Sequence, residues 1–200
     1  MSNFFSNKTN QKISGGRAVV ETLRTMGVNH VFGLIGSATM EIFDSLYHCK
    51  DIQFIGVRDE RTGTHMADGY ARATGKPGIM IAGQNGPGAT NLVTGVAQAA
   101  AAFSPVITIA GAISSEHLGK DSFQEINQQA LFEPITKKTW TINETAKIPE
   151  VFYDAFKLAL TPRSGPVHIN LPRNILSGEE NFKDFKKFEK KSPPLVTNNE

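Results

Sequence analysis

Gly78-Ile-Met-Ile-Ala-Gly83 is a short apolar run that ends at a glycine, and a second such run, Pro105-Val-Ile-Thr-Ile-Ala110, follows it along the chain. Between them, Gln84-Asn-Gly-Pro-Gly-Ala-Thr-Asn91 begins as a glycine- and proline-rich turn, and the small residues from Leu92 to Ala102 fit a helix. Strands that read as unbroken apolar runs and are joined by helices belong to parallel sheets covered on both faces. This stretch therefore predicts an α/β fold.

The same alternation continues in both directions from this stretch. Ser14 can cap a helix that Gly27 ends, and a helix from Glu60 to Thr74 would stop at Gly75. Further helices are expected near residues 38–48, 123–132 and 149–160, and further strands at 30–35, 54–57, 135–142 and 166–171, with 135–142 at an edge of the sheet. The pattern predicts a three-layer α/β/α domain with a mostly parallel sheet, over residues 14–175.

The two ends of the chain differ from this core in composition. Residues 1–13 are polar, and we expect a disordered N-terminal tail there. After Arg173 the chain has an alternation of phenylalanine and lysine and then Ser192-Pro-Pro194, so residues 176–200 are predicted to be a linker toward a missing central domain. The lysines between Lys183 and Lys191 alternate with acids, which favours a solvated tail over a binding patch.

Composition argues against several functional classes. The net charge of +2, from 21 basic and 19 acidic residues, gives no basic surface of the kind that binds nucleic acid. The single cysteine, Cys49, excludes an internal disulfide and suits a reducing compartment, and the histidines lack metal-ligand spacing, so no metal ligand is expected in this chain. No apolar run is long enough for a membrane span or a signal peptide. We therefore expect a soluble cytoplasmic protein that binds neither nucleic acid nor membrane.

Candidate chemistry lies where the predicted strands end, because ligands of open parallel sheets bind beyond the carboxyl ends of the strands. Gly36-Ser37, Arg58-Asp-Glu60 and the glycine-rich turn 83–91 all fall there. The turn lacks the lysine of a nucleotide P-loop and has no Gly-x-Gly-x-x-Gly, so by itself it could be only a tight turn into a packed helix. Glu60 by itself could be only a favourable partner of a helix dipole.

Together, these motifs resemble the pyrimidine-binding domain of the thiamine-diphosphate enzymes, in the acetolactate synthase superfamily. In that family a glutamate stands nine residues before the glycine of a Gly-Tyr-Ala-Arg run, and here Glu60 precedes Gly69 by nine residues. Gly86-Pro-Gly-Ala-Thr-Asn91, Asp121-Ser-Phe-Gln-Glu125 and Gly165-Pro-Val-His-Ile-Asn-Leu-Pro172 follow in the same order. The resemblance covers most of the chain, from about Ser14 to Ile175.

The resemblance implies a cofactor and a catalytic residue. Thiamine diphosphate lies across a subunit interface in this family, and the family glutamate hydrogen-bonds a nitrogen of its pyrimidine ring, which promotes ionisation of the reactive carbon. Carried over, Glu60 is the catalytic residue. Gly36, Pro87 and Asn91 would line the cofactor together with Glu60.

The same resemblance implies the substrate-binding residues. Ser37 would lie near the reacting carbon, and Asn85 belongs to the adjacent turn. Phe123 and Gln124 would face the substrate, although ordinary core packing is an equal alternative for Phe123.

Within the superfamily, several stretches look most like sulfoacetaldehyde acetyltransferase, which converts sulfoacetaldehyde and phosphate to sulfite and acetyl phosphate. One is Ile81-Ala-Gly-Gln-Asn-Gly-Pro87, where acetolactate synthases usually have Thr-Ser or Ser-Ser in place of Gln84-Asn85. An acetolactate synthase-like large subunit or a 2-oxoacid decarboxylase subunit is the alternative, favoured by the segment 119–125. Asp59 stands where the family has histidine, and this second acid either raises a pKa in the pair or points elsewhere.

The family motif that holds the diphosphate, Gly-Asp-Gly followed by Asn, is absent from these residues. We therefore expect Mg²⁺ and the diphosphate to be bound by a domain that this chain lacks, contributed by a second subunit of a homodimer or homotetramer, and we expect the chain alone to be inactive. The expected substrate is a small 2-oxoacid or sulfoaldehyde. A non-catalytic binding or regulatory module of the same fold is the alternative from another class.

Overall fold

A computed structural model describes residues 12–188 of the chain. Its centre is a sheet with the strand order β3-β2-β4-β5-β7-β6, in which every neighbouring pair is parallel. These strands are β2 (His30–Gly33), β3 (Gln53–Gly56), β4 (Gly78–Ile81), β5 (Val106–Ala112), β6 (Thr139–Thr141) and β7 (Val167–Pro172). The expected edge strand is β6, at the end of the sheet.

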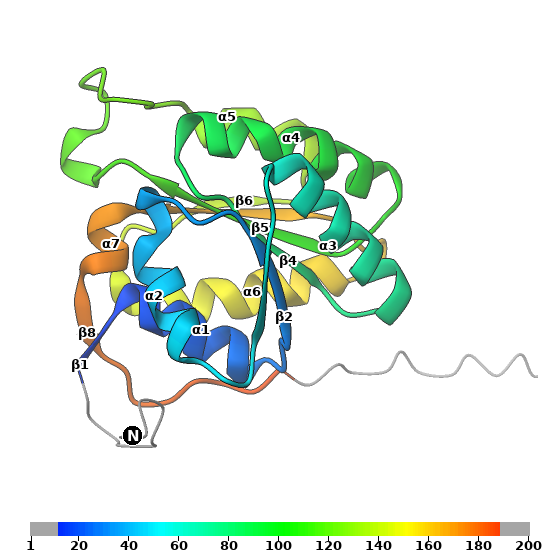
Figure 1. Ribbon diagram of the computed structural model, residues 1–200, viewed down its shortest axis with the longest axis horizontal. Coiled ribbons are helices and arrows are strands. Elements are labelled where there is room, and N and C mark those ends of the chain that lie inside the picture. The colour runs from blue at the N-terminus through cyan, green and yellow to red at the C-terminus, as the bar shows by residue number, and fades with distance from the viewer. Residues whose placement is uncertain (1–11, 189–200) are drawn as a thin grey trace, which may run out of the picture.

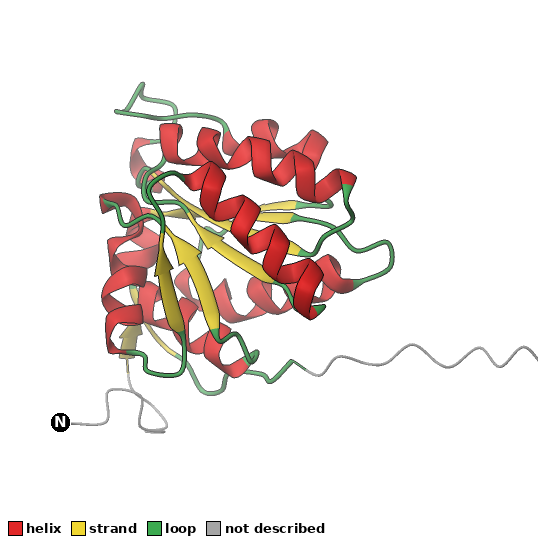
Figure 2. Cartoon of the chain, turned by 45° about the vertical axis from the view of Figure 1, so that its right-hand side comes forward, coloured by secondary structure: helices red, strands yellow, loops and turns green. Residues whose placement is uncertain are grey.

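Helices cover both faces of the sheet, as Figures 1 and 2 show. On one face lie α1 (Gly15–Thr25), α2 (Met40–His48), α6 (Ile148–Leu160) and the short α7 (Arg173–Ser177). On the other lie α3 (Glu60–Thr74), α4 (Gly86–Ala101) and the short α5 (Gln128–Phe132). Single 3₁₀ turns complete the list: η1 (Ser37–Thr39), η2 (Ser115–His117), η3 (Glu133–Ile135) and η4 (Thr145–Lys147). The predicted three-layer α/β/α architecture is confirmed.

The core is divided by the sheet into two apolar layers. Side chains alternate between the faces of a strand, so on β5 Ile107 and Ile109 pack toward α1, α2 and α6. Val106 and Ala110 pack toward α3 and α4. Every residue of β5 is buried, which explains why this strand reads as a continuous apolar run. Burying one such isoleucine contributes about 1.5–3 kcal/mol.

The ends of the long helices follow local sequence signals. The hydroxyl of Ser14 accepts a hydrogen bond of 3.2 Å from the backbone N–H of Arg17 and caps α1. Helix α3 ends at Gly75, whose left-handed φ of 65° lets its N–H donate to the carbonyl of Ala71. The predicted bounds of α3 are therefore confirmed.

The helix predicted for residues 123–132 is wrong in its first half. Only Gln128–Phe132 is helical, and Gln124 has a left-handed φ of 61° that no α-helix contains. Asn127 caps the shortened helix by accepting a hydrogen bond of 3.0 Å from the N–H of Ala130. The residues before Asn127 form a loop that extends beyond the sheet (Figure 1).

Part of each predicted tail packs against the domain. Strand β8 (Glu179–Asn181) pairs antiparallel with β1 (Lys12–Ser14). Phe182, Phe185 and Phe188 then pack against the core, and the ring of Phe188 lies 5.9 Å from that of Phe156. The alternation of phenylalanine and lysine that we took for a linker thus presents an apolar side to α6. The rest of both tails, residues 1–11 and 189–200, lies outside the described residues.

A buried histidine, His168 on β7, is held by a complete set of polar partners. Gln128 donates to the carbonyl of Gly111 at 2.8 Å, which leaves its oxygen to accept from Nε2 of His168 at 3.1 Å. Nδ1 lies 2.9 Å from the hydroxyl of Thr108, which also lies 3.3 Å from the carbonyl oxygen of Val167, and the ring stacks on Phe132. Burial lowers the pKa of His168 from 6.5 to about 3.

We predict that His168 makes stability depend on pH. The pKa of His168 is lower in the folded protein than in the unfolded chain. Its contribution to the free energy of unfolding is therefore complete above pH 6.5 and is lost as the pH falls from 6.5 toward 3, because in this interval the unfolded chain binds the proton more readily than the folded one. Between pH 6.5 and 4.5 the free energy of unfolding should fall by about 2–3 kcal/mol from this group. Urea unfolding of His168→Phe, which keeps an aromatic ring against Phe132, should show a free energy of unfolding that changes less between pH 6.5 and 4.5 than that of the wild type. The same pH dependence in both proteins would contradict this role of His168.

We also predict opposite effects for two helical glycines. A Cβ on Gly95 of α4 would lie 2.5 Å from the Cβ of Thr64 on α3, so Gly95→Ala should destabilise the protein by about 1–3 kcal/mol. A Cβ on Gly69 of α3 meets nothing within 4 Å, so Gly69→Ala should stabilise it by about 0.5–1 kcal/mol. Thermal unfolding of both variants measures the difference. The same sign for both would refute the proposed helix contact.

Candidate active site

The candidate site lies where β2 and β4 end side by side. The chain continues from β2 into η1 and α2 on one face of the sheet, and from β4 into α4 on the other. Such a switch in direction opens the crevice in which parallel sheets bind ligands. The two connections cross in direct contact: a Cβ on Gly36 would collide with the carbonyl of Gly83, and one on Gly83 would lie 2.5 Å from the carbonyl of Leu34.

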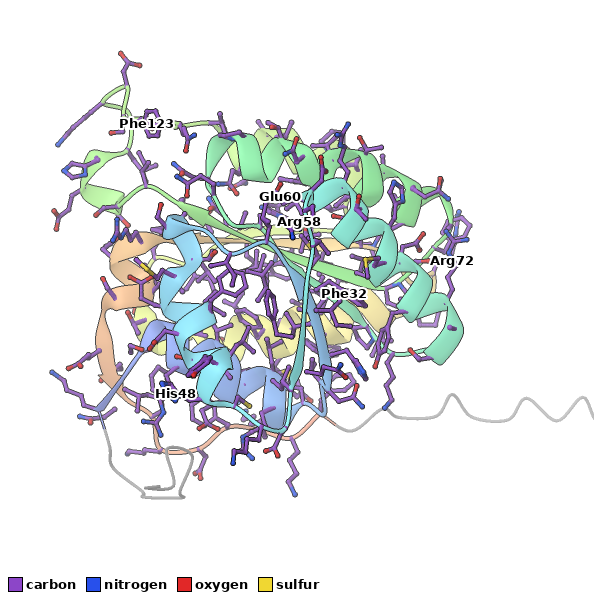
Figure 3. All side chains as sticks on the ribbon, in the orientation of Figure 1. Phe32, His48, Arg58, Glu60, Arg72 and Phe123 are labelled. Carbon is purple, nitrogen blue, oxygen red and sulfur yellow. The ribbon has the colours of Figure 1, made fainter. Side chains whose placement is uncertain are left out.

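Glu60, the first residue of α3, places its carboxylate in this crevice with a side chain that is nearly inaccessible, the residue being 3% exposed. Oε2 accepts a hydrogen bond of 3.1 Å from the side-chain amide of Asn91, and Oε1 accepts one of 3.4 Å from the backbone N–H of Gly83. A Cβ on Gly88 would lie 3.1 Å from Oε1, so α4 packs directly against the carboxylate. Figure 3 shows Glu60 at the start of α3, between the sheet and α4.

These contacts explain how a carboxylate can be buried here. A buried charge is tolerated only where hydrogen bonds replace water, and the donors of Asn91 and Gly83 do so. The N-terminus of α3 adds a favourable dipole. Each carboxylate oxygen accepts one hydrogen bond from the described residues, so it retains capacity for a further donor from a ligand.

Asp59 does not join Glu60 in an acid pair. Its side chain caps α3 by accepting from the N–H of Arg61 at 2.8 Å, and it also accepts two bonds from the guanidinium of Arg61. The hydrogen bonds from the side chain and then the backbone of Arg61 lower the pKa of Asp59 to about 2. Of the two alternatives drawn from the sequence, Asp59 therefore points elsewhere and does not share a proton with Glu60.

Ser37 lies at the surface of the crevice, tied to the β4 connection. The side-chain oxygen of Gln84 accepts from the hydroxyl of Ser37 at 3.0 Å and from the N–H of Ala38 at 3.2 Å. Gln84 therefore joins the two loops that cross at Gly36. No local pattern indicates this role of Gln84, because the hydrogen bond joins residues 47 apart in the chain.

Asn85 and the segment 122–125 meet at the start of α4. The side-chain amide of Asn85 donates to the backbone carbonyls of Phe123 and Gln124, each at 3.3 Å. Asn85 is buried, whereas Phe123 is 81% exposed, which excludes core packing for this ring. Figure 3 shows Phe123 on the loop beyond the sheet. The side-chain oxygen of Gln124 is buried and has no hydrogen-bond partner among the described residues.

The structure thus brings the predicted residues together in two groups. Glu60 and Asn91 are in direct contact at the carboxylate, with Gly36 at the crossing beside Gly83. Asn85 holds Phe123 and Gln124 one helical turn away. Pro87 is exposed in the first turn of α4, and no hydrogen bond links it to Glu60. Gly83, Gln84 and Gly88 lie in the turn 83–91 that was expected at the site, but their individual contacts with Glu60 and Ser37 were not predicted.

A cavity of about 280 Å³ lies at the opposite, amino edge of the sheet, lined among others by Met26, His30, Tyr70 and Phe156. It contains no buried carboxylate, and ligands of parallel sheets bind at the carboxyl edge. We therefore place the chemistry at Glu60. Within residues 12–188, no cluster of three or more His, Cys, Asp or Glu side chains could hold a metal ion. No helix in the described part of the chain is long and apolar enough to cross a membrane.

Comparison with known proteins identifies the family of the chain. A family model described as "Thiamine pyrophosphate enzyme, N-terminal TPP binding domain" matches residues 13–131. A probable acetolactate synthase large subunit of Methanocaldococcus jannaschii is 43% identical over 173 residues, which are 86% of this chain and 29% of that protein. Acetolactate synthase large subunits of Buchnera aphidicola subsp. Schizaphis graminum and Lactococcus lactis subsp. lactis are 43% and 40% identical, over 82% and 84% of this chain and 28% and 29% of their own.

The chain therefore spans less than a third of the length of the curated relatives it matches. The names of these relatives support the acetolactate synthase alternative better than the preferred sulfoacetaldehyde acetyltransferase assignment. Closeness to sulfoacetaldehyde acetyltransferase stays a prediction.

We predict that the hydrogen bond from Asn91 to the carboxylate of Glu60 stabilises the fold. Asn91→Leu keeps the side-chain volume but removes the donor to a buried carboxylate, so it should lower the free energy of unfolding by about 1.5–3 kcal/mol. In a Glu60→Gln background the same substitution should cost about 1 kcal/mol or less, because a neutral acceptor forms a weaker bond. Denaturant unfolding of the four proteins gives the coupling. If Asn91→Leu lowers the free energy of unfolding equally in the wild type and in Glu60→Gln, the hydrogen bond from Asn91 is no stronger to a carboxylate than to an amide.

Proposed function

The chain belongs to the thiamine pyrophosphate enzyme family, and on that premise we propose that it forms the pyrimidine-binding part of an acetolactate synthase-like enzyme acting on a 2-oxoacid. The observation that carries this proposal is the buried carboxylate of Glu60 at the carboxyl edge of the sheet. The names of the relatives support the reaction class.

The residues of the crevice fit one half of thiamine diphosphate. An aminopyrimidine ring is flat and carries N–H donors, and Glu60 offers charged acceptor capacity that two protein donors leave unfilled. The crossing at Gly36 and Gly83 has no room for side chains, so the backbone there can approach a ring closely. The unpartnered oxygen of Gln124 is a second acceptor nearby.

In this proposal Glu60 holds the cofactor's ring through a charge-assisted hydrogen bond, with Gly36, Pro87 and Asn91 around it. Thiamine diphosphate, when bound, supplies a carbon nucleophile that cleaves and forms bonds beside a carbonyl group. Glu60 would hold a ring nitrogen of the cofactor, and a carboxylate suits this place better than an amide because its hydrogen bonds to a positively charged partner are stronger. The amide of Asn91 and the N–H of Gly83 hold the carboxylate in position.

We further propose that Mg²⁺ and the diphosphate are held by the diphosphate-binding domain of a second subunit, in a homodimer or homotetramer. The carboxyl edge supports this arrangement, because Ile35, Met40 and Phe123 expose apolar side chains there. Ser37, Asn85, Phe123 and Gln124 would then lie on the substrate side of the interface.

Sulfoacetaldehyde acetyltransferase is the second candidate. It is favoured by Gln84-Asn85, which replaces the pair of small hydroxyl residues usual in acetolactate synthases. Both side chains are engaged in fixing loops around the crevice, so the substitution changes what surrounds the substrate and not Glu60 itself. The two candidates differ in product: acetolactate from a 2-oxoacid such as pyruvate, or sulfite and acetyl phosphate from sulfoacetaldehyde and phosphate.

We predict that Glu60→Gln in the assembled enzyme lowers kcat by about a hundredfold to ten-thousandfold, the range for loss of a group that assists proton transfer. Circular dichroism and melting should show that the fold persists, since the amide is nearly isosteric. Glu21→Gln is the matched control, because Glu21 is also a buried glutamate but pairs with Arg24 on α1. It should keep full turnover.

The assay should run the wild-type enzyme with each substrate pair in parallel. Acetolactate formation that Glu60→Gln abolishes supports the first candidate, and release of sulfite supports the second. Turnover by Glu60→Gln equal to that of Glu21→Gln would remove Glu60 from the mechanism. Failure of the assembled wild type with both substrate pairs would favour the non-catalytic alternative.

A further inference from the structure

After β5 the chain leaves the sheet and returns to it only at α5, and the intervening segment extends beyond the carboxyl edge (Figures 1 and 3). Long segments without regular structure are uncommon in a compact domain and usually have a function. Three residues of this segment have left-handed φ angles: Gly119 at 75°, Asp121 at 50° and Gln124 at 61°. For Asp121 and Gln124 this conformation costs free energy, so contacts must enforce it.

The carboxylate of Glu125 is one source of that enforcement. Oε1 accepts a hydrogen bond of 2.6 Å from the backbone N–H of Gly119, and Oε2 accepts one of 3.1 Å from the N–H of Ser122. The N–H of Glu125 itself donates to the carbonyl of Ser122 at 2.9 Å. One side chain thus closes the loop Gly119–Glu125 on itself. These backbone donors, Gly119 first, also lower the pKa of Glu125, so the carboxylate is charged near neutral pH.

Asn85 is the second source, and it connects the loop to the candidate active site. Its amide donates to the carbonyls of Phe123 and Gln124, as described above. The next residue, Gly86, lies so close that a Cβ there would be 2.5 Å from the carbonyl oxygen of Gln124. Two residues further on, Gly88 faces Oε1 of Glu60. The first turn of α4 therefore lies between the loop and the catalytic carboxylate.

We propose that Glu125 and Asn85 are positioning residues, which together hold the loop Gly119–Gln124 in one conformation beside Glu60 so that it defines the acyl-substrate side of the site. That the substrate on this side of the site is an acyl compound rests on the proposed function. Glu125 contacts only backbone of its own loop in the described hydrogen bonds, so it acts through Phe123 and Gln124. The loop carries the exposed ring of Phe123 and the buried, unpartnered carboxamide oxygen of Gln124.

The first experiment needs no substrate and uses the full chain. Hydrogen exchange of the backbone amides of Gly119 and Ser122, followed by NMR, should be about tenfold or more faster in Glu125→Gln, since an amide keeps only one acceptor oxygen. Asn85→Ala should accelerate exchange in the same segment. Glu116→Gln is the matched control, because Glu116 is an exposed glutamate of η2 in the same projecting segment, and it should leave these rates unchanged.

The second experiment measures kinetics in the assembled enzyme with the 2-oxoacid as substrate. Glu125→Gln should raise KM by at least about fivefold, the scale of one weakened hydrogen bond, and change kcat by less. Glu125→Asp, which keeps both acceptor oxygens on a shorter stem, should recover part of the effect. A role in stability alone would leave KM unmoved below the melting temperature.

The outcomes separate this inference from the proposed function. Unchanged exchange at Gly119 and Ser122 in Glu125→Gln overturns the inference, whatever the enzyme does. Faster exchange with an unchanged KM overturns the positioning role, because the loop would then be fixed without consequence for substrate. An assembled wild-type enzyme that is inactive toward 2-oxoacids overturns the proposed function, and the exchange rates still decide whether Glu125 and Asn85 fix the loop.

Discussion

The close approach of backbone to backbone at the ends of β2 and β4 is the constraint on which the rest of the site depends. Gly36 and Gly83 touch through main-chain atoms, which brings the two connections together before they separate to opposite faces of the sheet. Because β4 then leads directly into α4, this crossing fixes where α4 begins. The start of α4 in turn fixes three contacts: Asn85 with the projecting loop, Gly88 with the carboxylate, and Asn91 with the same carboxylate. A side chain at the crossing would displace all of them together.

Burial of the Glu60 carboxylate costs folding free energy, and the contacts around the carboxylate offset that cost. Desolvation of a carboxylate opposes folding, and the opposing terms here are few: one carboxamide donor, one long bond from a backbone N–H and the dipole of α3. That balance leaves acceptor capacity unfilled, which a purely structural carboxylate such as that of Asp59 does not show. Asp59 is saturated by Arg61 and is stabilised as an anion, whereas Glu60 is placed where a ligand can complete its coordination. The hydrogen bonds of the two adjacent acids thus separate their roles: Asp59 caps α3, and Glu60 faces the crevice.

Local signals in the sequence were sufficient for the alternation of strands and helices and for both ends of α3. The apolar runs around Ile79 and Ile107 predict buried parallel strands, and Gly75 predicts the end of α3 because it needs a left-handed φ. The predictions that were wrong concern segments held by contacts between residues far apart in the chain. The apolar residues before Gln128 resemble a helix, yet Glu125 and Asn85 hold them as a loop through bonds that no short-range pattern encodes. Phe188 likewise belongs to the core only because α6 offers a partner. The resemblance to the family singles out Glu60, but it does not indicate the donors to its carboxylate, since Asn91 reaches it across 31 residues of chain.

On the proposed function, the choice of substrate is made away from Glu60. A residue that holds a cofactor common to a family would not distinguish one member's substrate from another's. Gln84 and Asn85 are two of the residues that depart from the pattern expected of acetolactate synthases, and neither contacts the carboxylate of Glu60 through a hydrogen bond. Gln84 instead fixes the loop that carries Ser37, and Asn85 fixes the loop that carries Phe123. Substitution at this pair would therefore change both loops beside the crevice and leave the hydrogen bonds of Glu60 intact. If the proposed function holds, the substrate can change without a change at Glu60, because the loop-fixing residues Gln84 and Asn85 precede α4, whereas the carboxylate is held by Gly83 and by Asn91 within α4.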